Sequence, residues 1–139
     1  MGRVYAMIEL INNDDLSLVR NLIIKDDQVR RMHVNMLVDS GAYMMAINET
    51  IQAQLQFPFV EKRQAQMADG SLMEFDVVGP IQVRFANRKA VCNAFVLSGD
   101  NEPLLGAIPM EEMDVLISPQ RQELIVNPEH PYYAQLKMK

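Results

Sequence analysis

The sequence predicts an all-β domain, a closed or nearly closed β structure that carries one or two short helices. Two observations lead to this prediction. Short segments in which apolar and polar residues alternate recur along most of the chain, and turn signals separate them at intervals of about 8–12 residues. Segments with helical periodicity are few and short.

Composition limits the domain count and the kinds of partner. The chain has 139 residues, 49% of them apolar, which is enough for one domain with its own core. The net charge of −5 and the scattered basic residues argue against nucleic acid and anionic membranes as partners. No apolar run approaches the roughly 20 residues that span a bilayer, and none at the N-terminus suggests a signal peptide. With one cysteine, Cys92, we expect no internal disulfide and a cytoplasmic location.

Two strands are predicted in the first third of the chain. Residues 4–10 alternate, and in the longer strand 29–38 the apolar residues Met32, Val34, Met36 and Val38 fall on one face. The Asp and Asn clusters at 12–15 and 26–27 are interpreted as solvated turns. The adjacent basic pairs Arg30-Arg31, Lys62-Arg63 and Arg88-Lys89 are interpreted as solvated surface.

The sequence in the middle of the chain indicates a short helix followed by a hairpin. Asn48 can cap a helix that runs to about Leu55, and Pro58 ends that element. Residues 64–78 are typical of a β-hairpin, because Asp69-Gly70 at their centre is a strong two-residue turn signal.

The sequence from residue 81 onward indicates further strands and a second short helix. Pro109 suits a first helical turn, with Glu111 and Glu112 expected near its positive end. The domain is expected to span 1–126 and to leave 127–139 as a polar C-terminal tail. Four further strands are predicted, at 81–85, 90–97, 115–117 and 124–126.

Three motifs follow one another in a specific order. An apolar strand leads into Asp39-Ser40-Gly41-Ala42, a hairpin turn follows at Ala68-Asp69-Gly70-Ser71, and Leu104-Leu105-Gly106 precedes the second helix. Taken singly, these motifs are common as a plain turn, a chain reversal and a packed strand end. Their combination within one small β-rich domain is much more specific.

On these motifs the sequence resembles the retropepsin-like (clan AA) aspartic proteases, and within them small uncharacterised archaeal and bacterial proteins. The resemblance implies a retropepsin-like closed β-barrel, the acid protease fold, with one lobe per chain. It extends over nearly the whole chain. The segments that carry it are 29–30, 37–42, 68–70, 77–80, 104–109, 113–115 and 127–131.

The resemblance implies an aspartic endopeptidase that acts on a peptide or protein substrate without metal or cofactor. This chemistry uses two carboxylates about 3 Å apart that hold one water and share one proton. Asp39 would be the catalytic residue. Since no other aspartate follows an apolar strand and precedes Ser or Thr and then Gly, the second carboxylate is expected from Asp39 of an identical chain in a homodimer.

The resemblance also assigns supporting roles. Ser40 would brace the two active-site loops across the two-fold axis, and Gly41 would allow close backbone approach. Residues 68–71 would form the flap that closes on substrate. Leu104, Leu105 and Gly106 would lie under the active loop and exclude water.

Departures from the family pattern keep two alternatives open. Tyr43, Met44 and Met45 are bulkier than the residues that many members place after the loop, and Ala107 replaces a polar or charged residue. The same dimer could therefore bind extended peptides without cutting them, or the fold could serve as a monomeric scaffold. The tail could complete the dimer sheet, cover the cleft or be loose.

The remaining polar residues are given structural interpretations. His33 and His130 are not expected to bind metal, because no Cys or His clusters with them in the sequence. Cys92 is interpreted as a small buried hydrophobe, and Asp114 as a capping or pairing residue.

Overall fold

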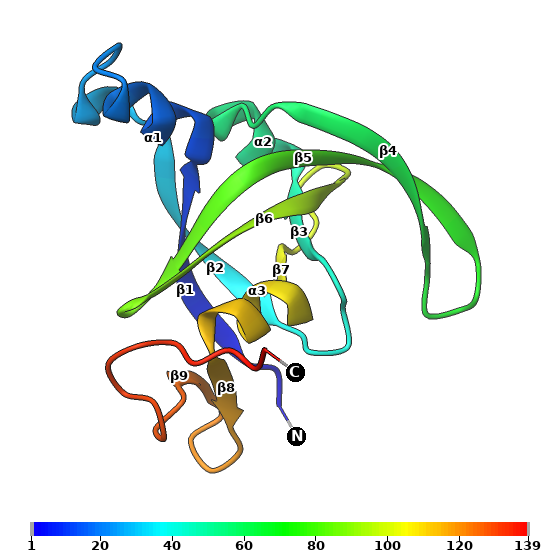
Figure 1. Cartoon of the computed structure of the whole chain (residues 1–139). Coiled ribbons are helices and arrows are strands. Elements are labelled where there is room, and N and C mark those ends of the chain that lie inside the picture. Colours follow the sequence, from blue (N-terminus) through cyan, green and yellow to red (C-terminus); the bar gives the residue numbers. More distant parts are fainter. Residues whose placement is uncertain (1, 139) are drawn as a thin grey trace.

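A computed structural model describes residues 2–138, and the chain is mostly β, as predicted (Figure 1). Strands account for 45% of the structure and helices for 18%. The strands are β1 (Tyr5–Asn12), β2 (Arg31–Val38), β3 (Met45–Asn48), β4 (Phe59–Gln66), β5 (Leu72–Phe85), β6 (Arg88–Leu97), β7 (Leu104–Leu105), β8 (Val115–Ser118) and β9 (Glu123–Val126). The helices are α1 (Asn13–Arg20), the 3₁₀ turn η1 (Asp26–Gln28), α2 (Glu49–Leu55) and α3 (Ala107–Met113).

Seven strands form one sheet in the order β1-β2-β7-β3-β6-β5-β4. Because β1 also pairs with β5, six of these strands close into a ring and β4 lies outside it. Most pairings are antiparallel, but β2 runs parallel to β7 and β3 runs parallel to β6. The prediction of a closed or nearly closed β structure is thus confirmed at the level of the ring. A separate two-stranded sheet joins β8 and β9.

Alternating apolar residues fill the ring. On β2, Val34, Met36 and Val38 are buried and Met32 is half-buried, which confirms the predicted inward face. The side chains of Ile8 and Leu10 on β1 are fully buried against them in the same core. Each such aliphatic side chain contributes about 1.5–3 kcal/mol through the apolar surface it removes from water.

The predicted number of short helices, one or two, was too low, because α1 forms where a solvated turn was expected. The Asn12 side chain accepts a hydrogen bond from the backbone N–H of Asp15 at 3.2 Å and so caps the helix. The predicted Asn48 cap is confirmed, since its side chain accepts from the N–H of Ile51 at 2.9 Å. Pro109 lies in the first turn of α3 as predicted, but Glu111 and Glu112 lie beyond it.

Asp15 was wrongly interpreted as part of a solvated turn, whereas its partner Arg30 is exposed, as interpreted. Asp15 is 3% exposed, and its carboxylate receives three hydrogen bonds of 2.9 Å from Arg30, one from the backbone N–H and two from the guanidinium. These bonds outweigh the cost of burial and lower the pKa of Asp15. Arg88, also expected on the surface, is 3% exposed and donates to the backbone carbonyl of His130.

The hairpin is longer than predicted and has a wider turn. Strand β5 continues through Gly79-Pro80 to Phe85, with a register shift between Val78 and Ile81, so the predicted strand 81–85 is its second half. The β4 and β5 ladder ends at Gln66 and Leu72, which leaves a five-residue loop in place of a two-residue turn. In Figure 1 this hairpin arches away from the ring.

Candidate functional site

The Asp39-Ser40-Gly41 loop begins where β2 leaves the core. Val38 pairs with Leu105 of β7, and the backbone N–H of Asp39 donates to the Leu105 carbonyl at 3.0 Å. The N–H of Ala42 then donates back to the Asp39 carbonyl at 3.2 Å, closing a tight turn. The loop therefore begins directly after the buried Val38, and its first residue is held by a backbone hydrogen bond to β7.

The Leu104-Leu105-Gly106 segment lies directly against this loop. Leu104 pairs with Leu37 of β2 and with Ala46 of β3, so β7 is inserted between the two strands that flank the loop. A Cβ on Gly106 would lie 2.5 Å from the Met44 carbonyl oxygen and 2.8 Å from that of Ala42. Only glycine permits this approach without displacing the loop backbone.

Backbone hydrogen bonds join α3 to the same loop. The N–H of Ala107 donates to the Ala42 carbonyl at 2.7 Å, and the N–H of Ile108 donates to the Tyr43 carbonyl at 3.0 Å. The two motifs that lie 65 residues apart, from Gly41 to Gly106, are therefore one structural unit.

The Asp39 carboxylate is half-buried and sparsely bonded. Its Oδ1 accepts from the backbone N–H of Gly41 at 2.9 Å. No hydrogen bond from residues 2–138 reaches its Oδ2. Ser40 is exposed, and its hydroxyl has no partner within the same residues. One oxygen of Asp39 is thus used to hold the loop and the other is open.

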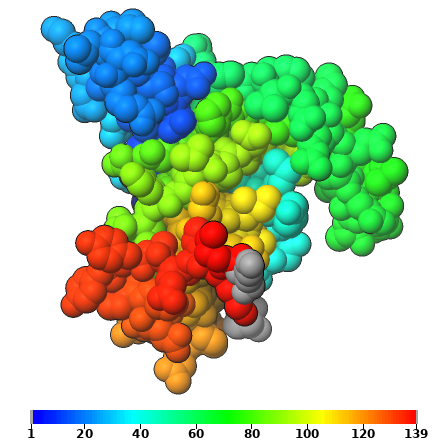
Figure 2. All heavy atoms as spheres, viewed as in Figure 1, coloured from blue at the N-terminus to red at the C-terminus, as the bar shows by residue number. Residues whose placement is uncertain are grey.

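A cleft of about 410 Å³ lies between this loop and the hairpin. Gly41, Tyr43 and Met44 line it on one side and the 63–67 segment of the hairpin on the other, with Phe75, Phe95, Leu97 and Leu104 among the apolar residues. Figure 2 shows the surface hollowed between the green hairpin and the cyan loop segment. No tail residue that the structure describes lines this cleft.

Asp39 and Ser40 do not line the cleft but border two smaller cavities. Asp39 borders a cavity of about 260 Å³ with the N-terminal segment 2–4 and Ile117. Ser40 borders one of about 380 Å³ with α3 and β8. The cleft therefore ends at Gly41, and the two polar side chains of the motif lie at its margin, on the face formed by the N-terminal segment, α3 and β8.

The predicted flap residues form the tip of the hairpin but do not line the cleft. Ala68, Asp69, Gly70 and Ser71 are all exposed, and the cleft lining stops at Met67. The Ser71 hydroxyl and the Ser71 backbone N–H both donate to the Asp69 carboxylate. These bonds, the hydroxyl bond above all, lower the pKa of that carboxyl. Gly70 adopts φ 86° with open space around it, as a turn tip requires.

The tail is bonded to the domain rather than loose. Asp114, after α3, accepts from the backbone N–H of Gln135 at 3.0 Å, the side-chain amide of Asn127 at 3.1 Å and the ring Nδ1 of His130 at 2.6 Å. The Gln135 and Asn127 bonds are the main reason that the pKa of Asp114 falls to about 2. Asp114 is therefore a pairing residue, as interpreted from the sequence.

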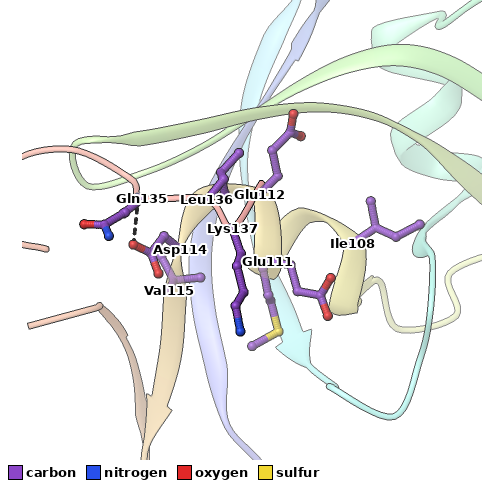
Figure 3. Close-up of a pocket in the computed structure, with 9 residues that line it drawn as sticks. Ile108, Glu111, Glu112, Asp114, Val115, Gln135, Leu136 and Lys137 are labelled. Carbon is purple, nitrogen blue, oxygen red and sulfur yellow. Dashed lines mark hydrogen bonds between the residues drawn. The ribbon is translucent and has the colours of Figure 1, made fainter. Parts of the chain in front are cut away.

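A further cavity, of about 570 Å³, lies between α3 and this tail (Figure 3). Gln135, Leu136 and Lys137 line one side of it, and Glu111 and Glu112 of α3 are among the residues opposite. It is separate from the cleft, since the two hollows share no lining residue.

Sequence reasoning missed Arg63, which lies on β4 and lines the cleft. The adjacent Lys62-Arg63 pair was interpreted as solvated surface, and Arg63 is indeed exposed, but its place in the cleft was not predicted. The alternation of β4 could have identified it, because Arg63 lies on the opposite strand face from Lys62, which does not line the cleft.

Among residues 2–138, no group of three or more His, Cys, Asp or Glu side chains is arranged to hold a metal ion. Within the same span, no helix has the length and apolar character needed to cross a membrane. Comparison with protein-family models found no matching family, and comparison with curated proteins found no match.

Proposed function

We propose that this chain is one lobe of a retropepsin-like aspartic endopeptidase, active as a homodimer in which Asp39 of each chain supplies one catalytic carboxylate. The observation that carries the proposal is the Asp39 loop itself. Its backbone is anchored by Leu105 and by the close approach of Gly106, one carboxylate oxygen is open, and an apolar cleft under a long hairpin begins at Gly41.

The chemistry follows from bringing two such carboxylates together. Two carboxylates in contact cannot both ionise cheaply, so they share one proton and titrate as a pair. The ionised member would take a proton from a water held between them, and the protonated member would donate to the oxygen of the scissile carbonyl. In each chain the Gly41 N–H bond to Oδ1 would keep the carboxylate oriented while Oδ2 faces the water.

The position of the motif supports a dimer. Asp39 and Ser40 lie at the margin of the cleft, on a face shared with the N-terminal segment 2–4 and β8. A two-fold axis beside this margin would place Asp39 against its own copy and would join the two clefts into one. The exposed Ser40 hydroxyl would then have a partner across the axis.

Asp39→Asn tests the proposal. Asparagine keeps an oxygen for the Gly41 N–H but cannot share the catalytic proton, so we expect peptide cleavage to fall by at least about a thousandfold. Cleavage of a mixed peptide library, followed by mass spectrometry, measures the loss, and light scattering measures the dimer. The matched control is Asp14→Asn. Because Asp14 is exposed, this variant should cleave peptides as the wild type does. Unchanged cleavage by Asp39→Asn would reject the proposal.

Peptide binding without cleavage is a second candidate, favoured by Tyr43. This side chain is 73% exposed beside the loop, and it lines the cleft together with Met44. Bulky side chains there would hold an extended peptide and hinder access of water to its carbonyl. A wild-type protein that binds library peptides and yields no product after long incubation would favour this candidate; product formation that depends on Asp39 would exclude it.

A further inference from the structure

The cleft contains one isolated positive charge. Among the described residues that line it, Arg63 is the only one with a formal charge at neutral pH, and none carries a carboxylate. The other lining residues are apolar, small or amide-bearing, apart from the phenol of Tyr43. A peptide in the cleft would therefore meet an apolar surface with one cation beside it.

The strand register keeps the nearby carboxylates away from this cation. Arg63 is paired with Phe75, while Lys62 is paired with Asp76 and Gln64 with Glu74. Since adjacent residues on a strand point to opposite faces, Arg63 and Phe75 share the cleft face, and Asp76 and Glu74 lie on the other.

The partners of the two neighbouring cations differ accordingly. Lys62 Nζ is 3.0 Å from Asp76 Oδ1 and forms an ion pair. The guanidinium of Arg63 donates within residues 2–138 only to the sulfur of Met44, at 3.8 Å, and a thioether is a weak acceptor. Its planar array of donors, which matches a carboxylate, is left open.

The apolar part of the cleft lies alongside Arg63. The rings of Phe75 and Phe95 pack with centroids 5.5 Å apart, and Leu104 lines the same cleft. In an extended peptide the side chains that point to one face are two residues apart. An apolar side chain over these residues and a second side chain near Arg63 would therefore belong to residues separated by one position.

We propose that Arg63 selects peptides with an acidic side chain two positions from an apolar one, both pointing into the cleft. The inference rests on the proposed function, because it takes the cleft to be the substrate site. Arg63 acts as a specificity-determining residue by donating hydrogen bonds to the carboxylate of Asp or Glu, and the Phe75, Phe95 and Leu104 surface receives the apolar side chain.

The first test uses cleavage of a designed peptide library. Each peptide has a central Leu or Phe, and the residue two positions away on either side is varied among Glu, Gln and Lys. We expect the wild type to cleave the better Glu peptide about tenfold more efficiently, in kcat/KM, than its Gln counterpart. Arg63→Gln should abolish this preference, and Arg63→Glu should transfer it to the Lys peptide. Equal kcat/KM for Glu and Gln peptides, or an unchanged preference in Arg63→Glu, overturns the inference.

Lys62→Glu is the matched control. It reverses the neighbouring charge on the opposite face of the same strand, so an effect of net charge alone would appear in both variants. We expect Lys62→Glu to keep the wild-type preference for Glu. Loss of the preference in both variants to the same extent overturns the assignment to Arg63, and matching circular dichroism spectra show that the variants are folded.

A binding measurement separates this inference from the proposed function. Fluorescence anisotropy with the same labelled peptides is measured on Asp39→Asn, which does not need to cut them. If Asp39→Asn binds Glu peptides about tenfold tighter than Gln peptides and Arg63→Gln removes the difference, the inference stands even when the wild type yields no products. If the wild type cleaves peptides but neither assay distinguishes Glu from Gln, the inference fails and the protease proposal stands.

Discussion

Two aspartates, Asp15 and Asp39, lie next to apolar strands, yet the structure surrounds them differently. Asp15 is 3% exposed, and both of its oxygens accept from Arg30. Asp39 is half-buried, accepts from the Gly41 N–H through Oδ1 and keeps Oδ2 open among residues 2–138. The first carboxylate is bonded as fully as a buried charge requires, and the second keeps the capacity to bind something else.

The difference extends to what anchors each carboxylate. Two of the three bonds to the Asp15 carboxylate come from the Arg30 guanidinium, which also donates to the Gln56 side chain at 2.8 Å. Backbone groups hold the Asp39 loop, through Leu105 and the approach of Gly106. A side-chain network contributes stability that depends on charge, whereas a backbone frame positions a carboxylate without neutralising it. The surroundings of an aspartate therefore distinguish a structural role from a chemical one better than the local sequence does.

The largest expected effect comes from disrupting the close approach of Gly106 to the backbone of the 39–44 loop. In Gly106→Ala the new methyl would lie 2.5 Å from the Met44 carbonyl oxygen, so the loop or β7 must move. We expect the free energy of unfolding to fall by about 3 kcal/mol and peptide cleavage to fall with it. Urea denaturation measures the first effect. The control is Gly2→Ala, where the Cβ would meet only Gln122 Oε1, at 3.5 Å. A Gly106→Ala protein as stable as the wild type would show that the loop does not depend on this contact.

The next largest expected effect is a difference in stability between variants of the two aspartates. Asp15→Asn removes the charge that Arg30 binds and should lower the free energy of unfolding by about 2–3 kcal/mol. Asp39→Asn keeps an acceptor for Gly41 and should change it by less than about 0.5 kcal/mol. Thermal and urea unfolding of the two variants, side by side, provide the measurement. Equal losses of stability would remove the distinction between a structural and a chemical aspartate.

The smallest expected effect is the pH dependence of the stability that the Asp15 carboxylate contributes. The Arg30 hydrogen bonds lower the pKa of Asp15 in the folded state, so the unfolded state binds the proton more readily. The resulting stability is present above the unfolded-state pKa of about 3.9 and is lost as the pH falls through the lower folded-state pKa. We expect the stability gap between wild type and Asp15→Asn to narrow as the pH falls from about 5. A gap that stays constant down to acid pH would contradict this account.

Much of the fold could be predicted from the local sequence. Alternation identified the inward face of β2, and the Asn48 cap identified α2, because both signals depend on neighbours along the chain. The helix α1 was missed because its Asn and Asp residues favour turns as readily as caps. The wider hairpin loop and the continuous β5 were missed because Asp-Gly and Gly-Pro pairs are also typical of tight turns and strand ends.

The candidate site could be predicted only in part, and the reason is physical. The chain by itself determined which residues alternate, where an apolar strand meets Asp39 and in what order the three motifs follow. Only the tertiary structure decided that β7 lies between β2 and β3, that Arg30 binds Asp15 and that Arg63 lines the cleft. Local patterns specify which face of a strand is apolar, but the partner of that face is chosen by packing among residues far apart in the chain.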